Sequence, residues 1–203
     1  MSHHRYIPIL VVAAVLLALT GPASSGGIRD HSDGFFLRLS AGGGSASTSL
    51  DLGIGDLEMS GFATDVNFAI GGVVTPNLAV HGTLFGWLVS DPDAEAGGMT
   101  AEITGDLDLS AIGIGVTYYI MPANVYLSGS LGAGSLTLDV PTGEGETDMG
   151  PVIDLTIGKE WWVSDSWGIG AAASLGYHSV PEKGIDENWS GTSFAIRFSA
   201  TYN

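Results

Sequence analysis

The chain has 203 residues, a formal net charge of −16 and a positive mean hydropathy of +0.31. Hydrophobic residues make up 45% of the chain and charged residues only 14%, which excludes an intrinsically disordered protein. The chain has six Lys and Arg residues and 22 Asp and Glu residues. This acidic excess excludes a nucleic-acid-binding protein, which needs clustered basic charge. The chain contains no Cys, so disulfides and thiolate sites are excluded as well.

The N-terminal segment has the layout of a secretory signal peptide. A basic start precedes an uncharged apolar run from Ile7 to Leu19, and small residues follow it. As a helix this run would span roughly 20 Å, which is short of a ~30 Å hydrocarbon core, and no later stretch is long enough for a transmembrane helix. We therefore expect a cleaved signal peptide at residues 1–25, a short N-terminal segment at residues 26–33 and one domain at residues 34–203.

The remainder of the chain predicts β-strands whose side chains alternate between two faces. Glycine accounts for 31 of the 203 residues and lies inside the periodic segments, where a long helix would tolerate it poorly. In the last segment, for example, Phe194, Ile196 and Phe198 alternate with small or polar side chains. Most segments approach or exceed the 9–11 residues that a tilted membrane strand needs. The eight segments are residues 34–44, 61–73, 78–89, 106–119, 125–136, 151–162, 167–179 and 192–202.

The connections between these segments alternate strictly in length. Three short turns fall at residues 74–77, 120–124 and 163–166, and four longer acidic connections fall at about 45–60, 90–105, 137–150 and 180–191. Short turns on one side and longer loops on the other are typical of outer-membrane barrels, whose loops face the outside of the cell. Most of the acidic residues lie in the long connections, where Lys183 is the only basic residue, so an acidic extracellular surface is predicted.

Three features favour a membrane barrel over a soluble one. The bulky apolar face carries one charge, Lys159, which lies near an interface and can extend its ammonium group to water. The opposite face consists mainly of small and hydroxyl side chains, whereas a soluble barrel would need bulky residues inside and many charges outside. Aromatic residues gather at strand ends, as in interfacial girdles. The girdle predicted at the short-turn end comprises Tyr118, Tyr126, Trp161, Trp162, Trp167 and Tyr202.

With these features the chain resembles the small eight-stranded outer-membrane barrels of the OmpA-domain and OmpX type over residues 34–203. The resemblance rests on the alternating turns and loops, the aromatic girdles, and a last strand that carries Phe198 and Tyr202. It implies an all-β, eight-stranded antiparallel up-and-down transmembrane barrel in the bacterial outer membrane. It also implies contact with membrane lipid and lipopolysaccharide, and insertion by the barrel assembly machinery.

Charged residues on the inward face must be paired. The interior of an eight-stranded barrel is just wide enough for its side chains, and an unpaired buried charge costs about 3–5 kcal/mol. Closure of the barrel brings the strands of Arg38 and Arg197 side by side. We therefore predict an interior polar network, and we favour a structural role for it over a conducting pore. The predicted network comprises Arg38, Asp65, Asp154, Glu160 and Arg197.

The sequence offers little for catalysis. Of the histidines after residue 25, only His178 falls at the outer rim, and the adjacent Ser179 should face the other way, which makes it a poor nucleophile partner. The acid clusters lack the full spacing of a calcium loop, so solvated loops are favoured over a metal site. We predict a non-enzymatic protein without cofactors that has a structural or surface-interaction role. Its acidic loops could meet divalent cations that bridge lipopolysaccharide, or a surface partner.

Three alternatives remain open at this point. The main one is a narrow transport barrel for small apolar molecules, because glycines on the inward face leave space unless they serve strand curvature or close approach. The second is a lipid-modifying outer-membrane enzyme. The third is a soluble ligand-carrying barrel, which the apolar outer face and the small, polar inner face of the strands disfavour. The inward glycines in question are Gly113, Gly115, Gly132, Gly168 and Gly170.

Overall fold

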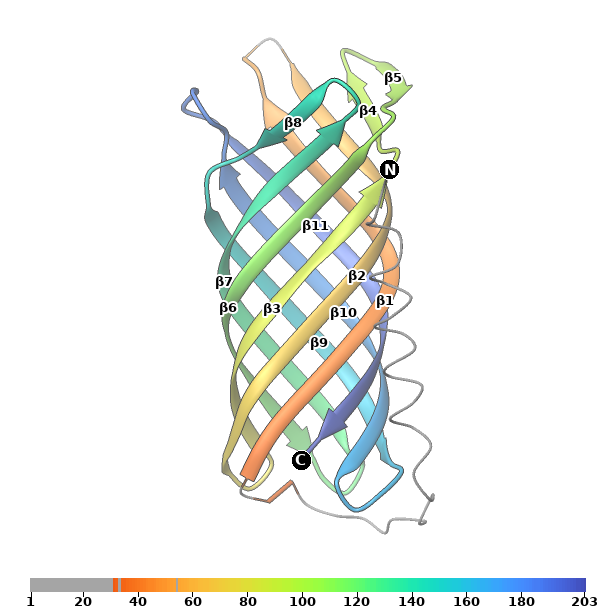
Figure 1. Ribbon diagram of the computed structural model, residues 1–203, viewed down its shortest axis with the longest axis vertical. Helices are drawn as coiled ribbons and strands as arrows, with labels where there is room; N and C mark the ends of the chain where they lie inside the picture. Colours follow the sequence, from red (N-terminus) through yellow and green to blue (C-terminus); the bar gives the residue numbers. More distant parts are fainter. Residues whose placement is uncertain (1–30, 33, 54) are drawn as a thin grey trace.

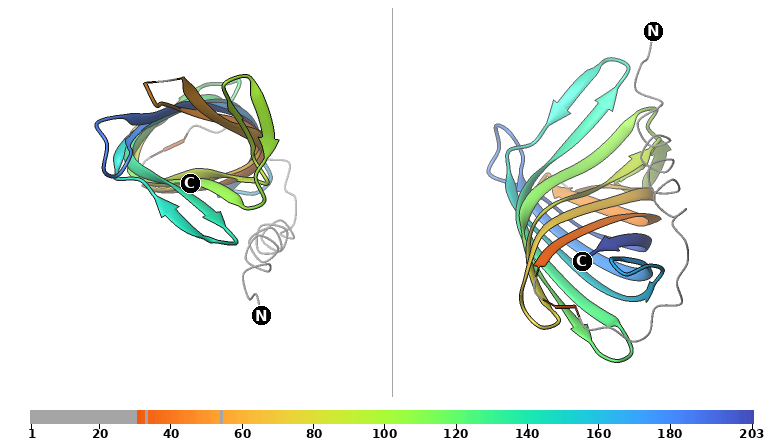
Figure 2. Two further views of the ribbon diagram at one scale, coloured as in Figure 1. Left: turned by 90° about the horizontal axis from the view of Figure 1, so that it is seen from above. Right: turned by 60° about the horizontal axis from the view of Figure 1, so that its bottom comes forward.

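The computed structural model describes residues 31–32, 34–53 and 55–203, so the predicted signal peptide lies outside the described residues. Within these ranges the chain forms one closed antiparallel β-barrel (Figure 1). Seen from above in Figure 2, the strands form a complete ring. No helix in the described part of the chain is long and apolar enough to cross a membrane.

Eight long strands make up the barrel wall, each antiparallel to both of its neighbours. They are β1 (Gly34–Asp51), β2 (Asp56–Thr75), β3 (Leu78–Ser90), β6 (Asp106–Ile120), β7 (Val125–Val140), β9 (Gly150–Trp162), β10 (Trp167–Pro181) and β11 (Asn188–Tyr202). Strand β1 pairs with β2 on one side and with β11 on the other, which closes the barrel. The predicted eight-stranded up-and-down barrel is therefore confirmed, and each strand is longer than its predicted segment.

The two ends of the barrel differ. The short connections β2–β3, β6–β7 and β9–β10 lie at one end, called the turn end here, and the longer hairpins lie at the other, called the loop end (Figure 1). The extra strands β4 (Asp93–Ala96) and β5 (Met99–Glu102) form a hairpin that adds to β2, and β8 (Gly143–Glu146) adds to β7. In outer-membrane barrels the turn end faces the periplasm.

The predicted connection at 45–60 is wrong in extent, because β1 and β2 stay paired as far as Asp51 and Asp56. The alternation of side chains continues through this stretch, with Ala46, Thr48 and Leu50 buried inside the barrel. Paired backbone groups of β1 and β2 satisfy one another's hydrogen bonds here, whereas an irregular loop would leave them to water. Much of the acidic surface is therefore carried on ordered hairpins.

Large apolar side chains cover the outside of the barrel. Ile114 and Phe198 are 72% and 71% exposed, and other Leu, Ile and Val residues of the wall are also exposed. A continuous apolar surface of this kind suits hydrocarbon rather than water. In β3 the outward positions are Val80, Leu84 and Leu88, which leaves Phe85 and Trp87 buried inside.

The barrel interior is layered along its axis. An apolar cluster fills the loop end and includes Phe85, Trp87, Leu109, Val152 and Val180. A second cluster at the turn end includes Phe36, Tyr119 and Tyr126. Buried polar and charged side chains lie between and among these clusters, so the interior carries the chemistry of the protein.

Candidate functional site

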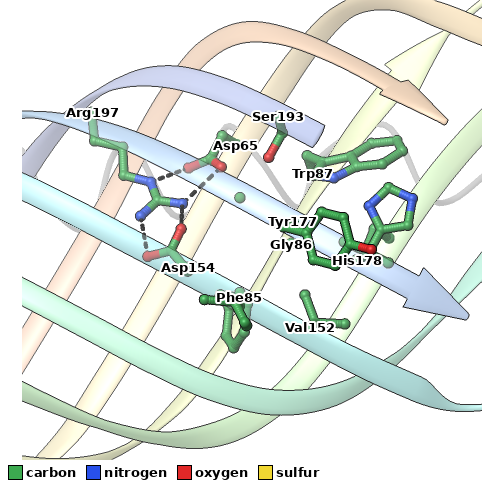
Figure 3. Close-up of a pocket in the computed structure, with 13 residues that line it drawn as sticks. Asp65, Phe85, Gly86, Trp87, Val152, Asp154, Tyr177, His178, Ser193 and Arg197 are labelled. Carbon is green, nitrogen blue, oxygen red and sulfur yellow. Dashed lines mark hydrogen bonds and ion pairs between the residues drawn. The ribbon is translucent and has the colours of Figure 1, made fainter. Parts of the chain in front are cut away.

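Arg197 of β11 binds two carboxylates at once in the barrel interior (Figure 3). Its Nε donates to Asp65 Oδ1 and its Nη2 to Asp65 Oδ2 at 2.9 Å. On the other side, Nη1 and Nη2 donate to the two Asp154 oxygens at 2.9 and 2.7 Å, and Nη1 also donates to Thr156 Oγ1 at 3.0 Å. These bonds account for all the N–H groups of a guanidinium, which is suited to paired contacts with carboxylates.

Arg38 of β1 forms a separate cluster nearer the turn end. Its Nη2 lies 3.2 Å from Glu160 Oε1 and donates to the Tyr119 hydroxyl at 2.6 Å. The Tyr119 and Thr201 hydroxyls donate to Glu160 at 3.1 and 2.7 Å, which fixes the carboxylate. The guanidinium carbon lies 3.9 Å from the centre of the Tyr126 ring, a cation–π contact. The charge on Arg38 is therefore compensated by one carboxylate and an aromatic face.

The structure thus divides the five residues of the predicted network into two clusters. Arg38 pairs with Glu160, whereas Arg197 pairs with Asp65 and Asp154. Arg38 lies opposite Thr201 on β11, four residues from Arg197, which separates the clusters by roughly 13 Å along the strand. All five side chains are buried, so both clusters are shielded from lipid and from water.

The girdle prediction is wrong for Tyr126 and Trp162. Tyr126 is 1% exposed and its ring lies inside, over Arg38. The ring fits there because Gly158 opposite it has no Cβ, and a Cβ at that position would lie 2.5 Å from the ring. The half-buried Trp162 ring lies 4.9 Å from the ring of His31, so Trp162 belongs to the mouth of the barrel.

The other four predicted girdle residues lie around the turn end. Tyr118 and Trp161 are half-exposed on the outer surface. Trp167 and Tyr202 contact each other edge to face, with ring centres 5.3 Å apart. Phe35 joins them, 6.1 Å from the Tyr202 ring. This aromatic band is placed where a girdle would meet the membrane interface.

His31 closes the turn end of the barrel, a role that sequence reasoning missed. Its ring is fully buried and stacks on Tyr119 with centres 3.4 Å apart. Nδ1 and Nε2 lie 3.1 and 2.9 Å from Oδ1 of Asn203 and of Asn124, and the backbones of His31 and Asn77 are linked by a 2.8 Å hydrogen bond. A lone histidine before the first strand gives no sequence signal for this arrangement.

The surroundings of His31 shift the pKa of its imidazole downward. Burial lowers the pKa of His31 below its usual 6.5, while the hydrogen bond with Asn124 and the nearby charge of Glu160 act in the opposite direction. Arg38 adds to the lowering.

The inward glycines do not leave an open channel. A Cβ on Gly113 would lie 2.4 Å from the Leu131 carbonyl oxygen, and one on Gly115 would lie 2.5 Å from the His81 ring. These glycines therefore permit close approach of neighbouring strands and side chains. A cavity of about 10 Å³ lies between the Arg197 cluster and His178, which is room for about one water molecule.

His178 is buried in the interior at the loop end. Its Nε2 lies 2.9 Å from the hydroxyl of Thr48, which is also buried, and its ring lies 5.9 Å from Trp87. The Ser179 hydroxyl instead accepts a hydrogen bond from Ser190 on β11. The arrangement gives His178 no exposed nucleophile, and its contacts are those of a packed interior residue.

The closed ring of eight antiparallel strands, its apolar outer surface and its paired interior charges define a small outer-membrane β-barrel protein. No protein-family profile and no curated protein sequence matches the chain.

The chain is similar to solved structures of outer-membrane proteins. Neisserial surface protein A aligns with a TM-score of 0.53 and 12% identity, over 83% of this chain and 96% of that one. OprG from Pseudomonas aeruginosa aligns with a TM-score of 0.43 and 13% identity, over 85% of this chain and 98% of that one. Ail from Yersinia pestis aligns with a TM-score of 0.42 and 16% identity, over 81% of this chain and 97% of that one. At 12% identity, the likeness to Neisserial surface protein A shows the fold alone.

Proposed function

We propose that the protein is a non-enzymatic barrel of the outer membrane that anchors an acidic surface and conducts no solute. The closed interior carries this proposal. The apolar cluster fills the loop end, the Arg197 and Arg38 clusters fill the middle, and His31 covers the turn end. The cavity beside Arg197 is too small for a passing solute.

The acidic hairpins are the part of the protein that meets the outside of the cell. Strand β4 presents Asp93 and Glu95, and β8 presents Glu144 and Glu146, beyond the barrel wall. The half-exposed Lys183 lies 3.2 Å from Glu146 and ties the β10–β11 connection to β8. We propose that these carboxylates meet divalent cations between lipopolysaccharide molecules, or a surface partner, after the barrel assembly machinery has inserted the chain.

Two measurements test this proposal. Fractionation with a heat-modifiability gel should place the protein in the outer membrane, with an N-terminus near residue 26 if the signal peptide is removed. In planar bilayers the refolded protein should give no stable openings under conditions in which a porin does. Stable openings would contradict the closed interior and support the transport alternative.

The proposal also excludes lipid chemistry. Expression of the wild-type chain and of a His178→Ala variant should leave the lipid A of a host strain with the same composition. A modification that appears with the wild type and disappears with His178→Ala would instead support the enzyme alternative.

A further inference from the structure

A shallow, open groove lies on the outer surface of the barrel near the turn end. Its floor is β10, where Ala171 and Ala173 face outward. Ile157 on β9 and Ile196 on β11 rise on either side, and both are about half-exposed. Short side chains between long ones therefore leave a furrow in an otherwise bulky apolar surface.

The register of the strands explains the shape of the groove. Ala173 lies opposite Ile157 on one side and Ile196 on the other. Ala171 lies opposite Lys159 and Phe198. The two walls are two strand spacings apart, about 10 Å, which is wide enough for one hydrocarbon chain to lie on the alanine floor.

Lys159 stands at the turn end of this groove and gives it a charge. Among the described residues it is the one cation on the apolar outer surface. Its Nζ donates to the Ala123 carbonyl at 2.6 Å and lies 5.9 Å from the centre of the Trp161 ring. An ammonium has three donors, so two remain for an anion at the level of the interface.

We propose that this groove binds one phospholipid of the periplasmic leaflet, with an acyl chain on Ala171 and Ala173 and the phosphate on Lys159. Charge complementarity carries the choice of occupant, because an uncompensated cation beside a hydrocarbon groove matches a lipid whose phosphate is joined to acyl chains. A second copy of this chain would need an anion facing Lys159, and the outward acids of the barrel wall, such as Asp106 and Asp108, lie at the loop end, away from Lys159. The proposal requires the outer face to lie in lipid and does not depend on whether the interior conducts.

Native mass spectrometry of the full chain in detergent, titrated with phosphatidylethanolamine, tests the proposal. Lys159→Gln should weaken lipid binding about fivefold, the size of one exposed charge contact. The matched control is Lys183→Gln, which removes the same charge at the loop end and should leave lipid binding unchanged. Diacylglycerol, which lacks the phosphate, should bind equally to the wild type and to Lys159→Gln.

A second variant tests the acyl-chain part of the site. Ala171→Leu fills the floor and should weaken the binding of both lipids, while a heat-modifiability gel checks that each variant is folded. Equal phosphatidylethanolamine affinity for the wild type and Lys159→Gln would overturn the proposal. A dimer that Ala171→Leu abolishes, without any lipid adduct in the wild type, would overturn it in favour of a second copy.

Discussion

Replacing Arg197 with Met tests whether the paired interior charges stabilise the barrel. Methionine has similar length and no charge, so the variant leaves the carboxylates of Asp65 and Asp154 unpaired at 3% and 5% exposure. Hydrogen bonds to charged groups contribute about 1.5–3 kcal/mol each, so five of them would sum to roughly 7–15 kcal/mol, which is comparable to the whole stability of a typical domain. The carboxylates can reorient or recruit water, so the cost of breaking a buried pair, about 3–5 kcal/mol, is the better magnitude.

The free energy of unfolding is measured in urea on detergent-refolded protein, with tryptophan fluorescence and gel mobility as independent probes. The control is the variant that combines Arg197→Met with Asp65→Asn and Asp154→Asn, which removes all three charges together. This control should recover part of the loss, because it leaves no uncompensated charge in the interior. An unchanged midpoint for Arg197→Met, or a combined variant as unstable as the single one, would refute the reasoning.

Two further predictions concern the turn end. His31→Ala should lower the stability of the barrel by about 2 kcal/mol through lost stacking and hydrogen bonds, as urea midpoints would show. Burial holds the pKa of His31 below 6.5, so its contribution to the free energy of unfolding is complete above pH 6.5 and is lost as the pH falls toward the lower pKa of the folded protein. Equal pH dependence of stability in the wild type and in His31→Ala would contradict this. Gly158→Ala should lower the stability by about 1–3 kcal/mol, because its Cβ would lie 2.5 Å from the Tyr126 ring. At Gly82 the atom nearest to an added Cβ is 3.9 Å away, so Gly82→Ala is the control and should be nearly neutral. Equal urea midpoints for the two variants would argue against the tight fit at Gly158.

The strands and their two faces follow from the sequence because the period of two is a local property. Each residue of a paired strand points to the side opposite its neighbours, so the position of Phe85 and Trp87 inside follows once Leu84 and Leu88 face lipid. The same rule places Tyr126 inside, and grouping it by its nearness to a turn was the source of the error. Aromatic content near a strand end does not by itself decide which face the ring occupies.

The division of the interior charges required the structure. The sequence brings the strands of Arg38 and Arg197 together, but the height of each residue in the barrel depends on the stagger between strands, which is a property of the closed ring. That stagger sets Arg197 at the level of Asp65 and Asp154 and Arg38 at the level of Glu160. The four-residue offset along β11 between Arg197 and the partner of Arg38 therefore gives two charge clusters in place of the single predicted network.

The contacts of His31 also bear on the order in which the barrel assembles. Asn77 lies in the β2–β3 turn and Asn124 in the β6–β7 turn, whereas Asn203 directly follows β11, which pairs with β1. Pairing of the first and last strands joins the residues most distant in the sequence, a step with a high entropic cost. The contacts with Asn77 and Asn124 do not need that step, whereas the contact with Asn203 does, so it adds stability to the closed ring that the open curved sheet lacks. His31 thus favours the completed barrel over an intermediate with an open edge.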